Sequence, residues 1–158
     1  SYMHLRYREK LYKGSISEFI RDEHVGIEKI VNFFNVWAHV LDQHPRCLRI
    51  SYEDMQKTPQ EQFKRILKTI GTTDIDSDAL EKAVAFSSFN NMKSMEATGQ
   101  GDSPWLLAGN LQDERTYKTR KGKIGEYLEH LEKDDIEFLD RLINQRLSTY
   151  FKQYYRIR

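Results

Sequence analysis

The chain has 158 residues, 39% of them hydrophobic and 12% aromatic, a composition that argues against wholesale disorder and fits one domain or part of one. Its formal net charge of +1 excludes a globally basic nucleic-acid binder, and no apolar run approaches the ~20 residues of a membrane-spanning helix. A single cysteine, Cys47, excludes an internal disulfide framework. With no targeting signal visible in the sequence, we expect a cytoplasmic location.

The first predicted elements are a helix and a strand. Apolar residues recur every three or four positions over residues 26–43, which is the spacing of a helix with one buried face. Residues 46–52 follow as a short predicted strand, because Leu48 and Ile50 alternate with polar neighbours. A lone strand is not a stable sheet, so its partners are expected outside this chain. Together with the abrupt start at Ser1, the strand predicts a piece of a larger domain.

A further helix is predicted after Thr58. This threonine, Pro59 at the first helical position and Glu61 have the spacing of a capping box in front of an apolar stripe. Gly71 is suited to end the helix in a left-handed turn. Residues 76–86 are the next predicted helix, with apolar residues spaced for one buried face.

The rest of the chain is predicted to contain two helices separated by a long loop. Ser87 or Ser88 is placed to cap a short helix that ends near residue 97. Residues 98–119 contain glycines and a proline and are expected to form a mobile loop, because loops above ~12–15 residues are often functional or disordered. The last helix is predicted over residues 133–151.

The run from Thr119 to Gly125, T-R-K-G-K-I-G, is the segment most typical of an anion site. Its glycines, Gly122 among them, allow close approach of the backbone to a ligand, and backbone N–H groups near a helix start attract anions. Arg120 offers a planar fork that matches phosphate oxygens, and Lys121 adds a compact charge. The run predicts a phosphate or sulfate site; the alternative is a solvated basic loop in front of an acidic helix.

Two aromatic residues are candidates for contact with a nucleotide base. Tyr52 ends the predicted strand, and ligands of open α/β sheets bind at the C-terminal ends of strands; the alternative is a core tyrosine. Phe89 can stack on a base while the hydroxyl of Ser87 or Ser88 bonds its edge. The alternative, a helix cap with Phe89 and Met92 buried, is compatible with that role. No histidines or cysteine have metal-ligand spacing, so no metal is expected.

Three motifs, taken in order, resemble those of a known family: Y-E-D-M at 52–55, S-F-x-x-M-K at 88–93 and R-K-G-x-x-G at 120–125. Over nearly its whole length, the chain is similar to the C-terminal half of the cytosolic-type sulfotransferases, which use 3′-phosphoadenosine-5′-phosphosulfate (PAPS). The resemblance implies an α/β fold of the P-loop type, with three layers around a central parallel sheet. Residues 1–158 would be the C-terminal portion of that single domain, supplying mostly helices and about one strand.

The resemblance also implies which residues hold the 3′-phosphate of the cofactor. Ser1 matches the serine that binds this phosphate. Arg120, Lys121 and Gly122 match the trio that grips it from the other side. A 3′-phosphate carries about two negative charges near neutral pH, which suits the two cations.

For the adenine ring, the resemblance implies a second group of residues. Tyr52 matches a tyrosine at the adenine, Ser87 a threonine that hydrogen-bonds it, and Phe89 the aromatic residue that stacks on it. Ser88 and Met92 belong to the same segment and are part of the expected cofactor site.

The implied reaction is sulfuryl transfer from PAPS to a hydroxyl or amine of a small-molecule acceptor, with adenosine 3′,5′-bisphosphate leaving and with no metal, nucleic acid or membrane involved. The phosphosulfate loop and the histidine base are expected upstream of Ser1, in the missing N-terminal half. No catalytic residue is therefore assigned here, and the chain alone is expected to be inactive. The family's dimer motif is not kept, which leaves the oligomeric state open.

Two other functions stay open on the sequence alone. A non-enzymatic helical module would bind phosphorylated or nucleic-acid partners through the basic loop 115–123, with salt-sensitive affinity. A P-loop kinase fragment is the third reading of the chain. Residues 1–158 contain no catalytic Asp motif and no second phosphate loop, which favours the sulfotransferase.

Overall fold

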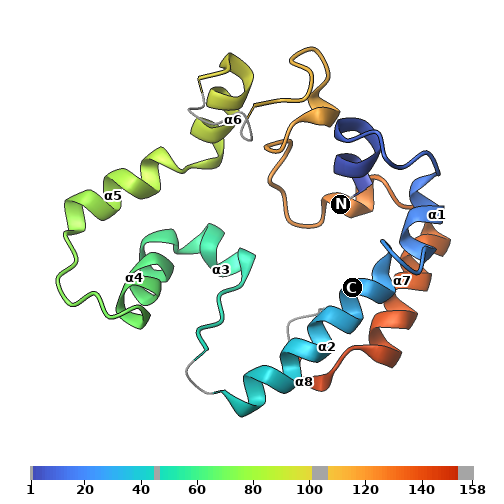
Figure 1. The fold of residues 1–158 in the computed structure, drawn as a ribbon, viewed down its shortest axis with the longest axis horizontal. Helices are drawn as coiled ribbons and strands as arrows, with labels where there is room; N and C mark the ends of the chain where they lie inside the picture. Colours follow the sequence, from blue (N-terminus) through green and yellow to red (C-terminus); the bar gives the residue numbers. More distant parts are fainter. Residues whose placement is uncertain (1, 45–46, 101–106, 153–158) are drawn as a thin grey trace. The chain divides into compact units, whose positions relative to one another are not determined.

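The computed structural model describes residues 2–44, 47–100 and 107–152. The chain forms two compact units. Unit 1 comprises Met3–Lys10 and Leu48–Ile124, and unit 2 comprises Tyr2, Leu11–Cys47 and the chain from Gly125 onward. Within the described ranges, all the regular secondary structure of both units is helical, as the ribbon in Figure 1 shows.

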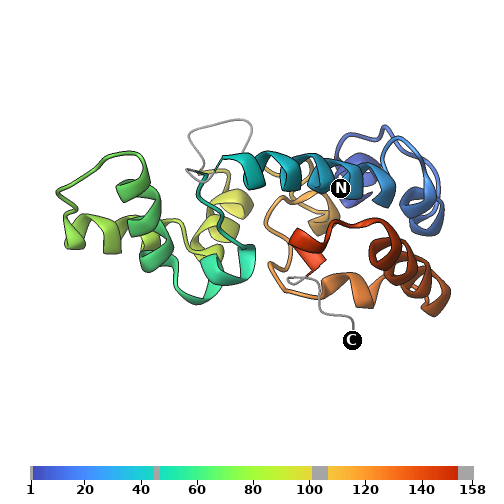
Figure 2. The ribbon, with the colours of Figure 1, turned by 90° about the horizontal axis from the view of Figure 1, so that it is seen from below.

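In its described residues, unit 1 contains four α-helices that follow one another along the chain. Each packs against the next, and Figure 2 shows α4 and α5 side by side. A short π-helix near the N-terminus packs against a 3₁₀ turn in the loop that follows α6. The elements are the π-helix His4–Arg8, α3 (Tyr52–Lys57), α4 (Pro59–Thr69), α5 (Ser77–Phe86), α6 (Phe89–Thr98) and the 3₁₀ turn Glu114–Thr116.

The helix predicted after Thr58 is confirmed as α4, which has Pro59 at its first position. Gly71 follows it with a φ of +93°, the left-handed conformation that the sequence predicted. The predicted capping box is wrong, because the Thr58 side chain does not cap the helix. Its hydroxyl instead donates to the Asp54 carbonyl at 3.3 Å and accepts from Gln62 Nε2 at 2.9 Å. Thr58 therefore joins the end of α3 to the start of α4.

Hydrogen bonds at the junction of α5 and α6 show which of the two candidate serines caps α6. Ser88 is the N-cap of α6, and its hydroxyl accepts from Asn91 N at 3.4 Å. Ser87 instead closes α5, donating its hydroxyl to the Val84 carbonyl at 3.3 Å. Gly99 ends α6 in a left-handed conformation with a φ of +68°.

Unit 2 is built around α2 and α7, which lie side by side (Figure 1). Val31 and Ala38 on α2 and Leu142 on α7 are buried, as is Phe19 on the short helix α1. The elements are α1 (Ile16–Arg21), α2 (Ile27–Gln43), a 3₁₀ turn Glu126–Glu129, α7 (Lys133–Arg146) and α8 (Thr149–Lys152).

The prediction of a single helix over residues 133–151 is wrong, because α7 and α8 are separated at Leu147 and Ser148. Leu147 has a ψ of 136° and leaves the helix. The Asn35 side chain bridges the break: its amide donates to the Arg146 carbonyl at 2.8 Å, and its carbonyl accepts from Ser148 N at 2.7 Å. A residue distant in sequence therefore satisfies the backbone groups that the interruption leaves open.

The predicted strand over residues 46–52 is also wrong in this structure. Residues 45–46 lie outside the described ranges, residues 47–51 form neither helix nor strand, and Tyr52 already begins α3. Cys47 is exposed. A strand needs a neighbour for its backbone hydrogen bonds, and none of the described residues forms one. The alternation of Leu48 and Ile50 is therefore not enough to make a strand without its partners.

The predicted loop over residues 98–119 is described only outside 101–106. Its first residue, Thr98, still belongs to α6, and the 3₁₀ turn Glu114–Thr116 interrupts its second half. Thr116 and Tyr117 are buried. The later part of this loop is thus packed within unit 1, and the predicted mobility stays a prediction.

Candidate functional site

Tyr52 is positioned by the start of α3. Ser51 caps this helix by accepting from Asp54 N at 3.0 Å, which places Tyr52 at the first helical residue. The Tyr52 side chain is 51% exposed, so the alternative of a core tyrosine is wrong. Its hydroxyl donates to the Gly122 carbonyl at 3.3 Å. The Tyr52 side chain therefore reaches the basic run that the sequence predicts as an anion site.

The Phe89 ring lies against the same glycine. A Cβ atom added to Gly122 would lie 2.5 Å from Phe89 Cε2, so the ring occupies the space that any side chain would need. Gly122 also has a φ of +59°, which disfavours residues other than glycine. Two independent constraints thus require glycine here, and the aromatic candidate for the base contacts the candidate phosphate loop directly.

For Met92, Ser87 and Ser88, the structure gives other surroundings than the contacts with Gly122 described above. Met92 is 41% exposed, so the alternative that buries it together with Phe89 on one helix face is wrong. The hydroxyls of Ser87 and Ser88 bond groups of the α5–α6 junction. Ser1 lies outside the described residues.

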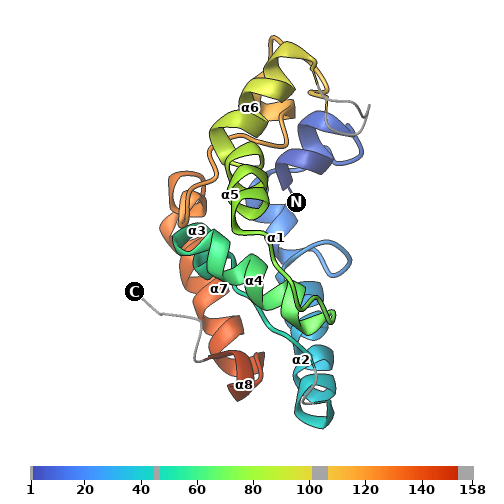
Figure 3. The ribbon, with the colours of Figure 1, turned by 90° about the vertical axis from the view of Figure 1, so that its left-hand side faces the viewer.

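The backbone before Gly122 is held by two side chains of α6, which lies beside this segment in Figure 3. Lys93 Nζ donates to the Arg120 carbonyl at 3.2 Å. The carboxylate of Glu96 accepts from the backbone N–H groups of Lys118 and Thr119 at 2.7 and 2.8 Å. The reasoning from sequence missed Glu96 altogether, and it named Lys93 only as the last letter of a motif.

The cations of the basic run differ in their surroundings. Arg120 is half-buried and Lys121 is exposed. Arg115 is engaged by Asp113, whose carboxylate accepts from Arg115 Nε at 2.8 Å and Nη2 at 2.9 Å. The hydrogen bond from Arg115 lowers the pKa of the partly exposed Asp113 carboxyl below its ordinary value. Arg115 is therefore partly neutralised by a carboxylate of its own loop.

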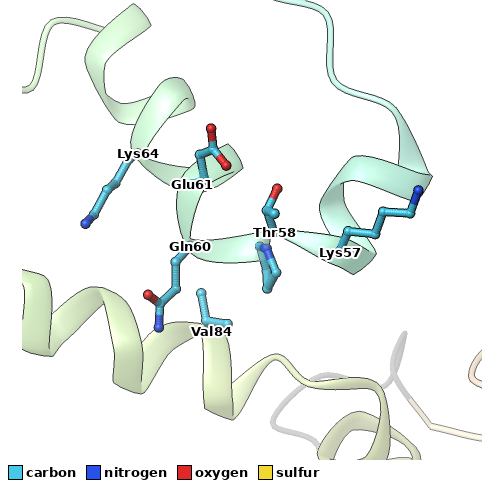
Figure 4. Close-up of a pocket in the computed structure, with 7 residues that line it drawn as sticks. Lys57, Thr58, Gln60, Glu61, Lys64 and Val84 are labelled. Carbon is cyan, nitrogen blue, oxygen red and sulfur yellow. The ribbon is translucent and has the colours of Figure 1, made fainter.

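An open groove elsewhere in unit 1, between α4 and α5, contains none of the predicted site residues. Figure 4 shows Gln60 and Val84 near each other in this groove, with Lys57 and Lys64 at its ends. Its lining is Lys57, Thr58, Pro59, Gln60, Glu61, Lys64 and Val84.

Neither a metal site nor a membrane span is found in the part of the chain that the structure describes. No three His, Cys, Asp or Glu residues within the described ranges gather where they could hold a metal ion. Within the same ranges, every helix is too short or too polar to cross a membrane.

The family of the chain follows from its sequence match. The sulfotransferase domain family matches residues 1–151, almost the whole chain. The chain belongs to the sulfotransferase domain family. No solved structure matches it significantly.

Three relatives illustrate the match. The chain is 28% identical over 117 residues to a flavonol 4′-sulfotransferase of Flaveria chlorifolia, an alignment that covers 72% of the chain and 35% of the relative. It is 26% identical over 117 residues to a flavonol 3-sulfotransferase of Flaveria bidentis, covering 72% and 37%. It is 25% identical over 131 residues to cytosolic sulfotransferase 6 of Arabidopsis thaliana, covering 75% and 38%. The chain thus spans little more than a third of the length of these relatives.

Proposed function

We propose that the chain carries the adenine and 3′-phosphate half of the PAPS site of a sulfotransferase. In this role, Arg120 and Lys121 bind the 3′-phosphate, and Tyr52 and Phe89 contact the adenine. The whole enzyme transfers a sulfuryl group from PAPS to an acceptor hydroxyl or amine.

The observation that carries the proposal is the cluster at Gly122. Tyr52 and Phe89 both lie against this glycine, although they precede it by 70 and 33 positions along the chain. An aromatic ring can stack on a base, and a planar guanidinium suits phosphate oxygens. The cluster therefore fits a ligand that joins a flat base to a phosphate, as an adenosine 3′-phosphate does.

The chemistry assigned to these residues is binding and orientation. PAPS, when bound, supplies the sulfuryl group, and in-line transfer of such a group depends mainly on positioning and on stabilised charge. Arg120 and Lys121 fix the nucleotide at its 3′-phosphate, and contacts remote from the reacting bond help to align it. The base that takes the acceptor proton is not assigned to any residue of this chain.

The rest of the domain is the proposed structural partner. The described helices of unit 2 leave apolar side chains on α2 exposed, with Phe33 57%, Val36 66% and Trp37 43% accessible. An exposed apolar patch of this kind often marks an interface. We propose that the remainder of an α/β domain of the P-loop type covers this face and supplies the parallel sheet to which residues 47–51 add.

The names of the relatives guide the proposals for the acceptor group and for the location of the protein. Two of the relatives are named for flavonols, which favours a hydroxyl over an amine as the acceptor group. A third is named as a cytosolic enzyme, which favours a cytoplasmic location for this chain.

Substitution of the phosphate-binding arginine tests the proposal. Arg120→Ala should weaken binding of adenosine 3′,5′-bisphosphate by about tenfold or more, because hydrogen bonds to charged groups contribute about 1.5–3 kcal/mol. Binding of adenosine 5′-monophosphate, which lacks the 3′-phosphate, should change little. Isothermal titration calorimetry measures both affinities, and Arg65→Ala on α4 is the matched control.

Equal losses for the two nucleotides in Arg120→Ala would contradict the assignment. Binding of any polyanion with strong salt dependence, and no preference for the bisphosphate, would favour the non-enzymatic module instead.

A further inference from the structure

Glu96 stands out among the described residues of unit 1, because it is a charged side chain only 3% exposed. Its Oε1 atom accepts from Lys118 N, and its Oε2 atom accepts from both Thr119 N and Thr119 Oγ1. A buried carboxylate is costly unless it is paired and hydrogen-bonded. Here most of its hydrogen bonds go to the backbone of one loop segment.

The Arg8 guanidinium binds backbone carbonyl groups of the same loop. Its Nη2 donates to the Leu107 carbonyl at 2.8 Å, and its Nη1 donates to the Thr116 carbonyl at 3.0 Å. The Arg8 side chain is 13% exposed, and its Nη1 lies 3.8 Å from Glu96 Oε1. The two opposite charges thus balance each other while each one binds backbone groups of the loop.

These bonds extend up to Arg120, the first of the residues proposed to bind the phosphate. Lys118 and Thr119 are fixed by Glu96, and the carbonyl of the next residue, Arg120, is bound by Lys93. A loop backbone outside regular helix and sheet would otherwise lose conformational entropy when it closes on a ligand. Here, side chains of α6 already fix the backbone of residues 118–120 before any ligand binds.

We infer that Glu96 is a positioning residue for the phosphate site. By holding the backbone of residues 118–119, it presents Arg120 and Lys121 in a geometry ready for the 3′-phosphate. This inference rests on the proposed function for the identity of the ligand.

Glu96→Gln is the sharpest variant, because it keeps the size of the side chain and replaces one of its two acceptor oxygens by an NH₂ donor. Its amide nitrogen would face a backbone N–H that needs an acceptor. Glu81→Gln, at an exposed position on α5 of the same unit, is the matched control. Both variants lose one negative charge, but only Glu96→Gln alters a buried carboxylate that binds the loop backbone and lies beside Arg8.

The first readout is the preference for adenosine 3′,5′-bisphosphate over adenosine 5′-monophosphate in calorimetry. Glu96→Gln should reduce this preference about tenfold, while Glu81→Gln leaves it unchanged. If Glu96 acted only through its charge, removing that charge would raise the affinity for a phosphate. Such a rise, or an equal loss for both nucleotides, would overturn the inference.

The second readout is hydrogen exchange at the backbone amides of Lys118 and Thr119, which needs no ligand. Exchange should be slow in the wild-type chain and in Glu81→Gln, and faster by about tenfold or more in Glu96→Gln. Unchanged exchange would overturn the claim that Glu96 holds this segment. Faster exchange with an unchanged nucleotide preference would make Glu96 structural only, and would also overturn the inference.

A wild-type chain with no preference for the bisphosphate would contradict the proposed function itself. The exchange experiment would then still decide whether Glu96 holds residues 118–119.

Discussion

Each unit contains a carboxylate that is only 3% exposed, Glu96 in unit 1 and Asp135 in unit 2, but the two bind different kinds of partner. Asp135 accepts from side chains of α1: the Ser17 hydroxyl at 2.7 Å and the guanidinium of Arg21. Glu96 accepts chiefly from the backbone of a loop. The first arrangement joins two helices, and the second fixes the path of a segment that has no regular structure.

The difference separates a role in stability from a role in binding. Loss of the Asp135 contacts should loosen the packing of α1 on α7 and lower the stability of the protein. Loss of the Glu96 contacts should release the segment that leads into Arg120. Substitution of Asp135 should therefore lower the stability of the protein, whereas substitution of Glu96 should weaken ligand binding. The following predictions run from the largest expected effect to the smallest.

Asp135→Asn should have the largest effect on stability. It removes the charge that pairs with Arg21, and we expect the free energy of unfolding to fall by about 2 kcal/mol, as for hydrogen bonds to charged groups. Asp134→Asn is the matched control, because Asp134 is the exposed neighbour in the same helical turn. Urea denaturation measures both variants, and equal losses would show that Asp135 has no special structural role.

The stability of the wild-type chain should also depend on Asp135 at acidic pH. Burial raises the pKa of this carboxyl, but hydrogen bonds from Ser17 and Arg21 and the Arg21 charge outweigh it, so the pKa lies below the ordinary value of 3.8. The stabilisation is therefore complete well above pH 3.8 and is lost as the pH falls through the lowered pKa. The difference in unfolding free energy between wild type and Asp135→Asn should shrink on acidification. A constant difference would contradict this assignment.

Gly122→Ala should disturb the candidate site in unit 1. The added methyl group would meet the Phe89 ring, and overpacking of this kind costs about 1 kcal/mol or more. Gly99→Ala is a close control, because Gly99 has a similar φ of +68° and no atom within 4 Å of an added Cβ. The excess loss of unfolding free energy in Gly122→Ala measures the ring contact alone, and equal losses in the two variants would argue against it.

Tyr52→Phe should have the smallest effect of the series. It removes one exposed hydrogen bond to the Gly122 carbonyl, so we expect a loss of about 0.5 kcal/mol or less in unfolding free energy. Nucleotide affinity should fall only slightly, since the aromatic ring remains. A calorimetric loss as large as that of Arg120→Ala would mean that the hydroxyl, and not the ring, makes the main contact.

The longer helices of unit 1, α4, α5 and α6, were predictable because their signals are local. Pro59 at the start of α4, Gly71 after its end and Ser88 as the cap of α6 lie within or beside the elements that they delimit. The strand over residues 46–52 and the unbroken helix over 133–151 were not, because both depend on distant groups. The strand needs partners that the described residues do not provide, and the helix is interrupted where Asn35, more than a hundred residues earlier, bonds the backbone.

The sequence indicates candidate contact residues for the site, but it does not indicate the residue that supports them. The residue types of Phe89, Arg120 and Gly122 indicate contact with a base or a phosphate by their own chemistry. Glu96 follows Phe89 by two helical turns and carries no such signal, because a glutamate on a helix is usually exposed. Only the structure shows it buried and bound to the backbone of the loop.

The most direct test of the central claim is calorimetric titration of the wild-type 158-residue chain with adenosine 3′,5′-bisphosphate and with adenosine 5′-monophosphate. If unit 1 carries the 3′-phosphate half of a PAPS site, the bisphosphate should bind at least about tenfold more tightly, which corresponds to 1.4 kcal/mol. Equal affinities for the two nucleotides would contradict the account.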